Sequence, residues 1–152
     1  MIIETFPVGL FQCNCTILGD EETREAIVID PGDDPETIQE RLTKHGLALK
    51  QIVCTHTHID HVGAIHGLQE RLETPASIHK ADLFLFEKLD VQAQFIGLPA
   101  PKRGAIDHFV QDGDAVRRCG CGFLGSGGRC DGHDYFFSAF FAFAAPLDAS
   151  PL

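Results

Sequence analysis

The pattern of apolar and polar positions predicts three strands at the start of the chain, and the second of them alternates between the two kinds of residue. They cover Ile2–Val8, Cys13–Leu18 and Glu25–Ile29. A polar stretch at residues 19–22 separates the second strand from the third, and such a short polar connection between alternating segments is typical of an antiparallel hairpin.

Helical spacing follows these strands in two places. Ile38 and Leu42 lie four residues apart on one face of a helix for which Asp34 is the expected N-cap, Pro35 the first helical position and Gly46 the end. A second helix is indicated by apolar residues that recur three or four positions apart: Val62, Ile65, Leu68 and Leu72. A strand at Ala76–His79 and a helix at Ala81–Leu89 continue the alternation, so the sequence predicts an α/β fold.

A cluster of metal-ligating side chains follows an apolar strand predicted at Gln51–Thr55. His56 and His58 lie two residues apart in a loop and can hold one ion, and Asp60 and His61 can turn toward a second ion. Imidazole and carboxylate groups together suit zinc, iron or manganese. The alternative is that these histidines face solvent at the start of a helix, and the number of such groups between a buried strand and an amphipathic helix argues against it.

The sequence of this cluster resembles that of a known family. The motif T-H-T-H-I-D-H-V-G at residues 55–63 closely resembles the H-x-H-x-D-H signature of the metallo-β-lactamase superfamily. Residues 11–19 and the A-I-V-I-D-P-G stretch at residues 26–32 resemble the opening hairpin of small bacterial glyoxalase II-like hydrolases. The G-L-P stretch at residues 97–99 and the D-G-D stretch at residues 112–114 occur in the order expected of that family. The resemblance covers residues 1–116.

The resemblance implies an αββα sandwich with a binuclear metal site. By that resemblance His56 and His58 serve the first metal, and Asp60 and His61 serve the second, with Asp60 also assigned as the catalytic residue. It implies two Zn²⁺ ions per complete site, with iron or manganese as alternatives. A metal-activated hydroxide would attack a thioester, lactone or amide carbonyl, and glyoxalase II-like thioester hydrolysis is the leading interpretation. Asp30 is either a partner of a ligating histidine or a plain turn residue.

The family pattern is incomplete in this sequence. The resemblance implies three later ligands, in segments similar to H-T-P-G-H-T-x-G, G-D-T and G-H, and the sequence contains none of these segments. The one histidine after residue 116 is His133, whose neighbours resemble none of them. We therefore expect an incomplete sandwich: residues 1–116 form the N-terminal part of the family domain, and residues 117–152 form a Gly/Cys/Phe-rich tail, hypothesised to result from a frameshift or a truncation.

Composition divides the chain at the same position. Residues 1–116 hold nine Lys and Arg against nineteen Asp and Glu, so the whole net charge of −10 lies there. An acidic chain is a poor partner for nucleic acid or an anionic membrane, and we expect a small-molecule thioester or ester as the substrate. No basic start or uninterrupted apolar stretch indicates a signal peptide, which makes a cytoplasmic protein the expectation. The oligomeric state stays open.

The remaining cysteines and histidines are given simpler interpretations. Cys13, Cys15 and Cys54 are interpreted as small buried apolar residues, and the C-x-C…C pattern of the tail is a weak metal signal. Four further histidines are interpreted as surface residues: His45, His66, His79 and His108. Three alternative functions remain: a lactonase, a mononuclear iron persulfide dioxygenase, and a catalytically impaired or inactive metal-binding remnant.

Overall fold

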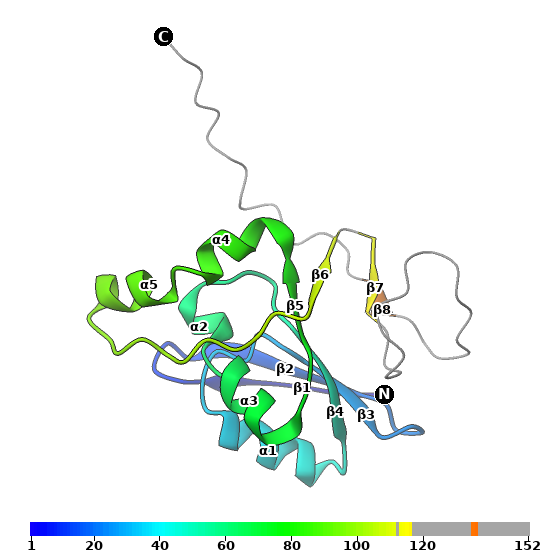
Figure 1. Cartoon of the computed structure of the whole chain (residues 1–152). Coiled ribbons are helices and arrows are strands. Elements are labelled where there is room, and N and C mark those ends of the chain that lie inside the picture. Colours follow the sequence, from blue (N-terminus) through cyan, green and yellow to red (C-terminus); the bar gives the residue numbers. More distant parts are fainter. Residues whose placement is uncertain (112, 117–134, 137–152) are drawn as a thin grey trace.

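The computed structural model describes residues 1–111, 113–116 and 135–136. A six-stranded sheet forms the centre, and its strands lie side by side in the order in which they occur along the chain (Figure 1). The strands are β1 (Ile2–Val8), β2 (Cys13–Gly19), β3 (Glu25–Ile29), β4 (Ala48–Val53), β5 (Ala76–His79) and β6 (His108–Val110). The α/β prediction is therefore confirmed.

The sheet changes direction at β3. Strands β1, β2 and β3 pair antiparallel, whereas β3, β4, β5 and β6 pair parallel. The predicted hairpin is confirmed, with Thr16 of β2 opposite Ile29 of β3. Along β2 buried residues alternate with less buried ones, while Ala26, Ile27 and Val28 of β3 are all buried. Continuous burial is the pattern of a strand covered on both faces.

Helices connect the parallel strands. They are α1 (Pro35–Lys44), α2 (Ile59–Val62), α3 (Ile65–Leu72), α4 (Leu83–Phe86) and α5 (Leu89–Ile96), with a 3-10 turn, η1, at Lys80–Asp82. Helices α1 and α3 lie against each other over one face of the sheet (Figure 1). Ile38 of α1 and Ile65 and Leu68 of α3 are fully buried in the core that these elements share. The predicted spacing of apolar residues thus marks the face that each helix buries.

The helix predicted at Ala81–Leu89 is wrong in its bounds. The chain instead forms η1, then α4, and turns at Lys88 before α5 begins. The apolar residues of α4 are consecutive, so they carry no 3.6-residue period that could show where one helix ends. Leu89 and Ala93 anchor α5 in the core, and Gly97, with a φ of 72°, ends it.

The carboxyl ends of β3 and β4 meet at one edge of the sheet. The turn after β3 packs its backbone directly against the loop and helix after β4. A Cβ atom on Gly32 would lie 1.8 Å from the Asp60 carbonyl oxygen, so only glycine fits there. This close approach places Asp30, which precedes Gly32, beside the predicted metal-binding motif.

A final short ladder pairs β7 (Ala115–Val116) antiparallel with β8 (Tyr135–Phe136). The predictions made for His133, for the C-x-C…C pattern and for most of the 117–152 tail lie outside the described residues. Among the helices that the structure does describe, none is both long and apolar enough to cross a membrane.

Candidate metal centre

The loop between β4 and α2, together with α2 itself, brings three histidines together. The ring centroids of His56 and His58 are 4.8 Å apart, and those of His56 and His61 are 3.9 Å apart. His58 is in an extended conformation at the start of α2, and its carbonyl oxygen accepts a hydrogen bond of 2.9 Å from the His61 amide. Asp60 lies in the first turn of α2. The four residues that the sequence predicted as metal ligands therefore lie together in the structure.

Carboxylates hold His61 from both sides of its ring. Its Nδ1 lies 3.2 Å from Oδ2 of Asp30, and its Nε2 lies 3.5 Å from Oδ2 of Asp60. Asp30 is buried and is fixed by Thr55, whose amide and hydroxyl donate to its two oxygens at 2.7 Å each. Of the two interpretations of Asp30, this geometry agrees with a partner of the motif histidine.

The two ends of the motif differ in their affinity for protons. Burial lowers the pKa of His56, and the neighbouring His61 and His58 act in the same direction. Burial alone would also lower the pKa of His61, but its hydrogen bond to Asp30 and the charges of Asp30 and Asp60 outweigh burial and raise that pKa. His56 is therefore a neutral donor near pH 7, whereas His61 lies in a site that favours a positive charge.

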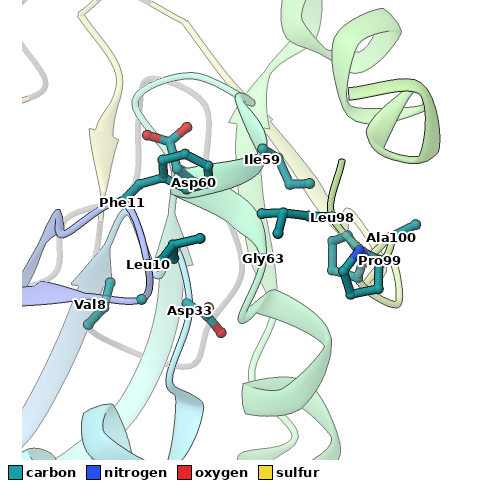
Figure 2. A pocket seen from close by; sticks show the side chains of 13 residues that line it. Val8, Leu10, Phe11, Asp33, Ile59, Asp60, Gly63, Leu98, Pro99 and Ala100 are labelled. Carbon is teal, nitrogen blue, oxygen red and sulfur yellow. The ribbon is translucent and has the colours of Figure 1, made fainter. Parts of the chain in front are cut away.

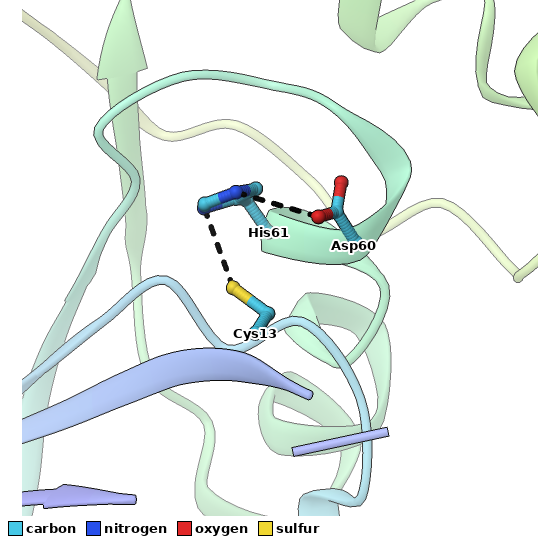
Figure 3. A group of neighbouring side chains, drawn as sticks. All are labelled: Cys13, Asp60 and His61. Atoms are coloured by element: carbon cyan, nitrogen blue, oxygen red, sulfur yellow. Dashed lines mark hydrogen bonds and ion pairs between the residues drawn. The ribbon is translucent and has the colours of Figure 1, made fainter. Parts of the chain in front are cut away.

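Sequence interpretation missed the position of Cys13 beside the motif. Its side chain is buried as expected, but its Sγ lies 3.5 Å from Nδ1 of His61. One ligand atom each from Cys13, Asp60 and His61 lie within 4.8 Å of one another (Figure 3). Burial, reinforced by the charges of Asp30 and Asp60, raises the pKa of the Cys13 thiol to about 12. The signal in the sequence was the alternation along β2, which points Cys13 to the buried face.

A glutamine from α5 fixes the backbone of the motif. Gln92 accepts a hydrogen bond of 2.9 Å from the Ile59 amide and donates to the carbonyl oxygens of Thr57 and Leu85 at 3.2 and 2.9 Å. The hydroxyl of Thr57, which is fully buried, donates to the Asp82 carbonyl oxygen at 2.8 Å. The loop is therefore held on both sides of His58. Sequence reasoning missed Gln92 because it did not predict α5.

Two hollows open beside Asp60, and their walls are mainly apolar. One is a cavity of about 360 Å³. Val8, Leu10 and Phe11 lie on one side of it, and Leu98 and Pro99 lie on the other (Figure 2). A groove of about 750 Å³ follows α4 and α5 and also has Asp60 in its wall. Among the other residues of that groove are His58, Phe84, Lys88, Val91 and Phe95. The motif therefore lies where a small molecule can reach it.

Two of the histidines interpreted as surface residues are half-buried, and each lies beside a glutamate. His45 Nε2 lies 2.6 Å from Oε2 of Glu4, and His66 Nε2 lies 3.2 Å from Oε1 of Glu70. Neither glutamate belongs to the motif, so these contacts give no reason to add His45 or His66 to the candidate centre.

Comparison with known proteins agrees with this geometry. The family model of the metallo-beta-lactamase superfamily matches residues 8–133. Hydroxyacylglutathione hydrolase GloC of Haemophilus influenzae is 38% identical over 137 residues, which cover 88% of this chain and 64% of that protein. The chain thus spans less than two thirds of the length of this relative.

Solved structures share the fold. TTHA1623, solved in a di-iron-bound form, is similar with a TM-score of 0.66 and 34% identity, covering 72% of this chain and 55% of that one. The B3 metallo-beta-lactamase BLEG-1 has a TM-score of 0.68 and 24% identity, covering 78% and 57%. These similarities support the predicted metallo-β-lactamase fold.

Proposed function

The chain belongs to the metallo-beta-lactamase superfamily, and we propose that it acts as a metal-dependent hydrolase of a small-molecule thioester or ester. The observation that carries this proposal is the convergence of His56, His58, Asp60 and His61 at one edge of the sheet. Three imidazoles and a carboxylate fit a divalent cation, because zinc, iron and manganese all accept these donors. The family likewise implies divalent metal binding.

We assign each pair of donors to one ion. His56 and His58 would hold the first ion, and Asp60 and His61 the second, with Zn²⁺ as the proposed metal and iron or manganese as alternatives. The di-iron form of TTHA1623 supports a two-ion site in a relative. Divalent ions in such a site supply Lewis acidity and lower the pKa of coordinated water, which is the chemistry that hydrolysis near neutral pH requires.

The chain's own residues would orient the substrate and exclude water. Asp60 borders both hollows, so a carbonyl group placed near it would have apolar walls on either side. Asp30 would hold the ring of His61 in one orientation, and Lys88 in the wall of the groove would attract an anionic part of the substrate. The name of the GloC relative, a hydroxyacylglutathione hydrolase, supports a thioester as the substrate class.

A metal-binding protein without turnover is the second candidate. Within the residues that the structure describes, the motif offers two donors to each ion, and a closed zinc site has four ligands. Two-ligand sites bind metal more weakly and leave the distance between the ions unfixed. This observation favours the remnant interpretation as the alternative to an active enzyme.

Turnover by the metal-loaded chain decides between these candidates. Hydrolysis of S-lactoylglutathione would be followed for the zinc-loaded protein, for His58→Ala and for His66→Ala, a control outside the motif. The hydrolase proposal expects activity that His58→Ala abolishes and His66→Ala retains. Absence of turnover at full metal loading, with lactones and a persulfide also tested, would establish the remnant.

We also propose that residues 117–152 result from a frameshift or a truncation, although the family model extends past residue 116, to residue 133. The support is compositional: the tail has no net charge and holds half of the twelve Phe. Reading the encoding nucleotides in the other frames tests the frameshift. It expects an H-x-x-x-H segment downstream of codon 116, and no such segment in any frame would rule a simple frameshift out.

A further inference from the structure

The groove along α4 and α5 continues directly from the candidate centre. Its volume is about 750 Å³, and His58 and Asp60 of the motif line it together with residues of the two helices. A hollow of this size accommodates a small organic molecule. A molecule whose reacting group lies at the motif can therefore extend along the helices.

One face of α5 is turned toward the motif. Gln92 contacts the backbone on either side of His58, through the Thr57 carbonyl oxygen and the Ile59 amide. Phe95 follows Gln92 by three residues, which places it on the same face of the helix. Both residues line the groove. Helix geometry thus sets an aromatic side chain beside the residue that holds the motif loop.

The helical wall of the groove exposes large apolar side chains. Phe84 is 71% exposed, Val91 52% and Phe95 91%. A contiguous apolar surface of this kind marks a place where a ligand or a partner binds. Here the ligand is the better match, because the same groove contains two residues of the candidate centre.

Charge narrows the chemistry of that ligand. Among the described residues that line the groove, Lys88 is the one lysine or arginine. Its side chain also has a hydrocarbon stem that can cover apolar groups. A glutathionyl group carries two carboxylates and an ammonium group, and this wall offers few partners for them. A hydrocarbon chain fits the wall better.

We propose that the groove binds the apolar acyl chain of the substrate, with the scissile carbonyl group at His58 and Asp60. The inference rests on the proposed hydrolase and names its substrate class: a thioester or ester of an aliphatic acid longer than a lactoyl group. Phe84, Val91 and Phe95 would then determine specificity for the chain, without taking part in the chemistry at the motif.

A series of acyl thioesters tests the inference. Thioesters of N-acetylcysteamine, from acetyl to octanoyl, share one leaving group, so differences in kcat/KM report the acyl chain. Full burial of a methylene changes the free energy by an amount equal to about a fourfold change in rate or affinity. For the zinc-loaded chain we expect kcat/KM to rise about two- to fourfold per methylene. A value that does not depend on chain length would overturn the inference.

Variants locate the effect in the groove. The double variant Phe84→Ala and Phe95→Ala should flatten the dependence on chain length, and both positions are exposed enough to change without loss of the fold. Phe109→Ala on β6 is the control, because Phe109 is 40% exposed and lies outside the groove. A dependence that survives in the double variant would overturn the inference.

Binding without turnover separates this inference from the proposed hydrolase. Calorimetry with straight-chain carboxylates from acetate to decanoate should give a Kd that falls with chain length in the zinc-loaded chain. Since every member carries the same carboxylate, the change in Kd reports the hydrocarbon part. Such binding without hydrolysis would refute the hydrolase and leave the groove as a site for apolar chains. Turnover with no preference for longer acyl chains would do the reverse.

A second copy of the chain is the other occupant that the groove could take. Light scattering should give the unaltered chain and Phe95→Asp the same mass in solution. A dimer that Phe95→Asp dissociates would show that another copy covers the groove, and would overturn the inference.

Discussion

The two ends of the motif differ in what surrounds them. His56 at one end has two other histidines as neighbours, and its pKa is lowered. His61 at the other end has Asp30 and Asp60 beside it, and its pKa is raised. The carboxylates beside His61 thus favour a cation at that end before any ion binds. At the other end, His56 offers a neutral nitrogen. One six-residue segment can therefore form two unequal ion sites.

The largest expected effect is that of the metal itself. A ligand that binds only the folded state stabilises it by about 2.7 kcal/mol at a concentration one hundred times its Kd. We expect zinc to raise the melting temperature of the chain and a chelator to reverse the rise. His61→Ala should reduce the zinc-dependent rise more than His56→Ala does, because the carboxylates surround His61. If His61→Ala and His56→Ala reduced the zinc-dependent rise in melting temperature equally, the two ends of the motif would not differ as we propose.

Asp30→Asn should weaken one end selectively. Asn keeps the shape and tolerates the φ of 53° at this position, but it removes the charge beside His61. Loss of such a contact behind a metal ligand costs about 10–100-fold in affinity. Competition with a chromophoric chelator measures the change. A matched control is Asp33→Asn, in the wall of the cavity, which should leave zinc affinity unchanged.

Gln92→Ala should loosen both ends together. It leaves the Ile59 amide and the Thr57 carbonyl oxygen without this partner, at a cost of about 1–3 kcal/mol in the free energy of unfolding. Gln94→Ala, on the exposed side of the same helix, is the control. Hydrogen exchange should speed up at residues 57–59 in the first variant and stay unchanged in the second. Unchanged exchange in both would show that α5 does not hold the loop.

The smallest effect concerns protonation in the metal-free chain. NMR titration should place the midpoint of His61 above 6.5 and that of His56 below 6.5. Because the folded state raises the pKa of His61, its contribution to stability is full below the unfolded pKa and is lost as pH rises through the folded pKa. The pH dependence for His56 is the reverse, because its folded pKa is lowered. Its contribution to stability is full above the unfolded pKa and is lost as pH falls through the folded pKa. Coincident midpoints would refute the electrostatic contrast.

Local sequence patterns predicted the parts of the molecule that depend on local chemistry. Alternation predicted β2, short apolar segments predicted β1 and β3, and helical spacing predicted which faces of α1 and α3 are buried. The clustering of His56, His58, Asp60 and His61 needed no folding information, because the four residues are neighbours in sequence. The four residues lie close together in the structure because one short loop and the helix that follows it contain them all.

The parts that escaped prediction depend on contacts between distant segments. Cys13 reaches His61 across 48 positions of sequence, and Gln92 reaches Ile59 across 33. The sequence around Cys13 or Gln92 contains no pattern from which its contact could be predicted. Asp30 left two interpretations open for the same reason. Only the packing of the turn after β3 against the motif brings its carboxylate to His61.

Counting the metal ions bound by each end tests the central claim most directly. Elemental analysis of the zinc-saturated chain should give two ions per chain for the unaltered protein, one for His58→Ala and one for Asp60→Ala. The ion that remains in His58→Ala should be the more tightly held. An unaltered chain that binds no zinc, or variants that keep both ions, would contradict a two-ion centre built on this motif.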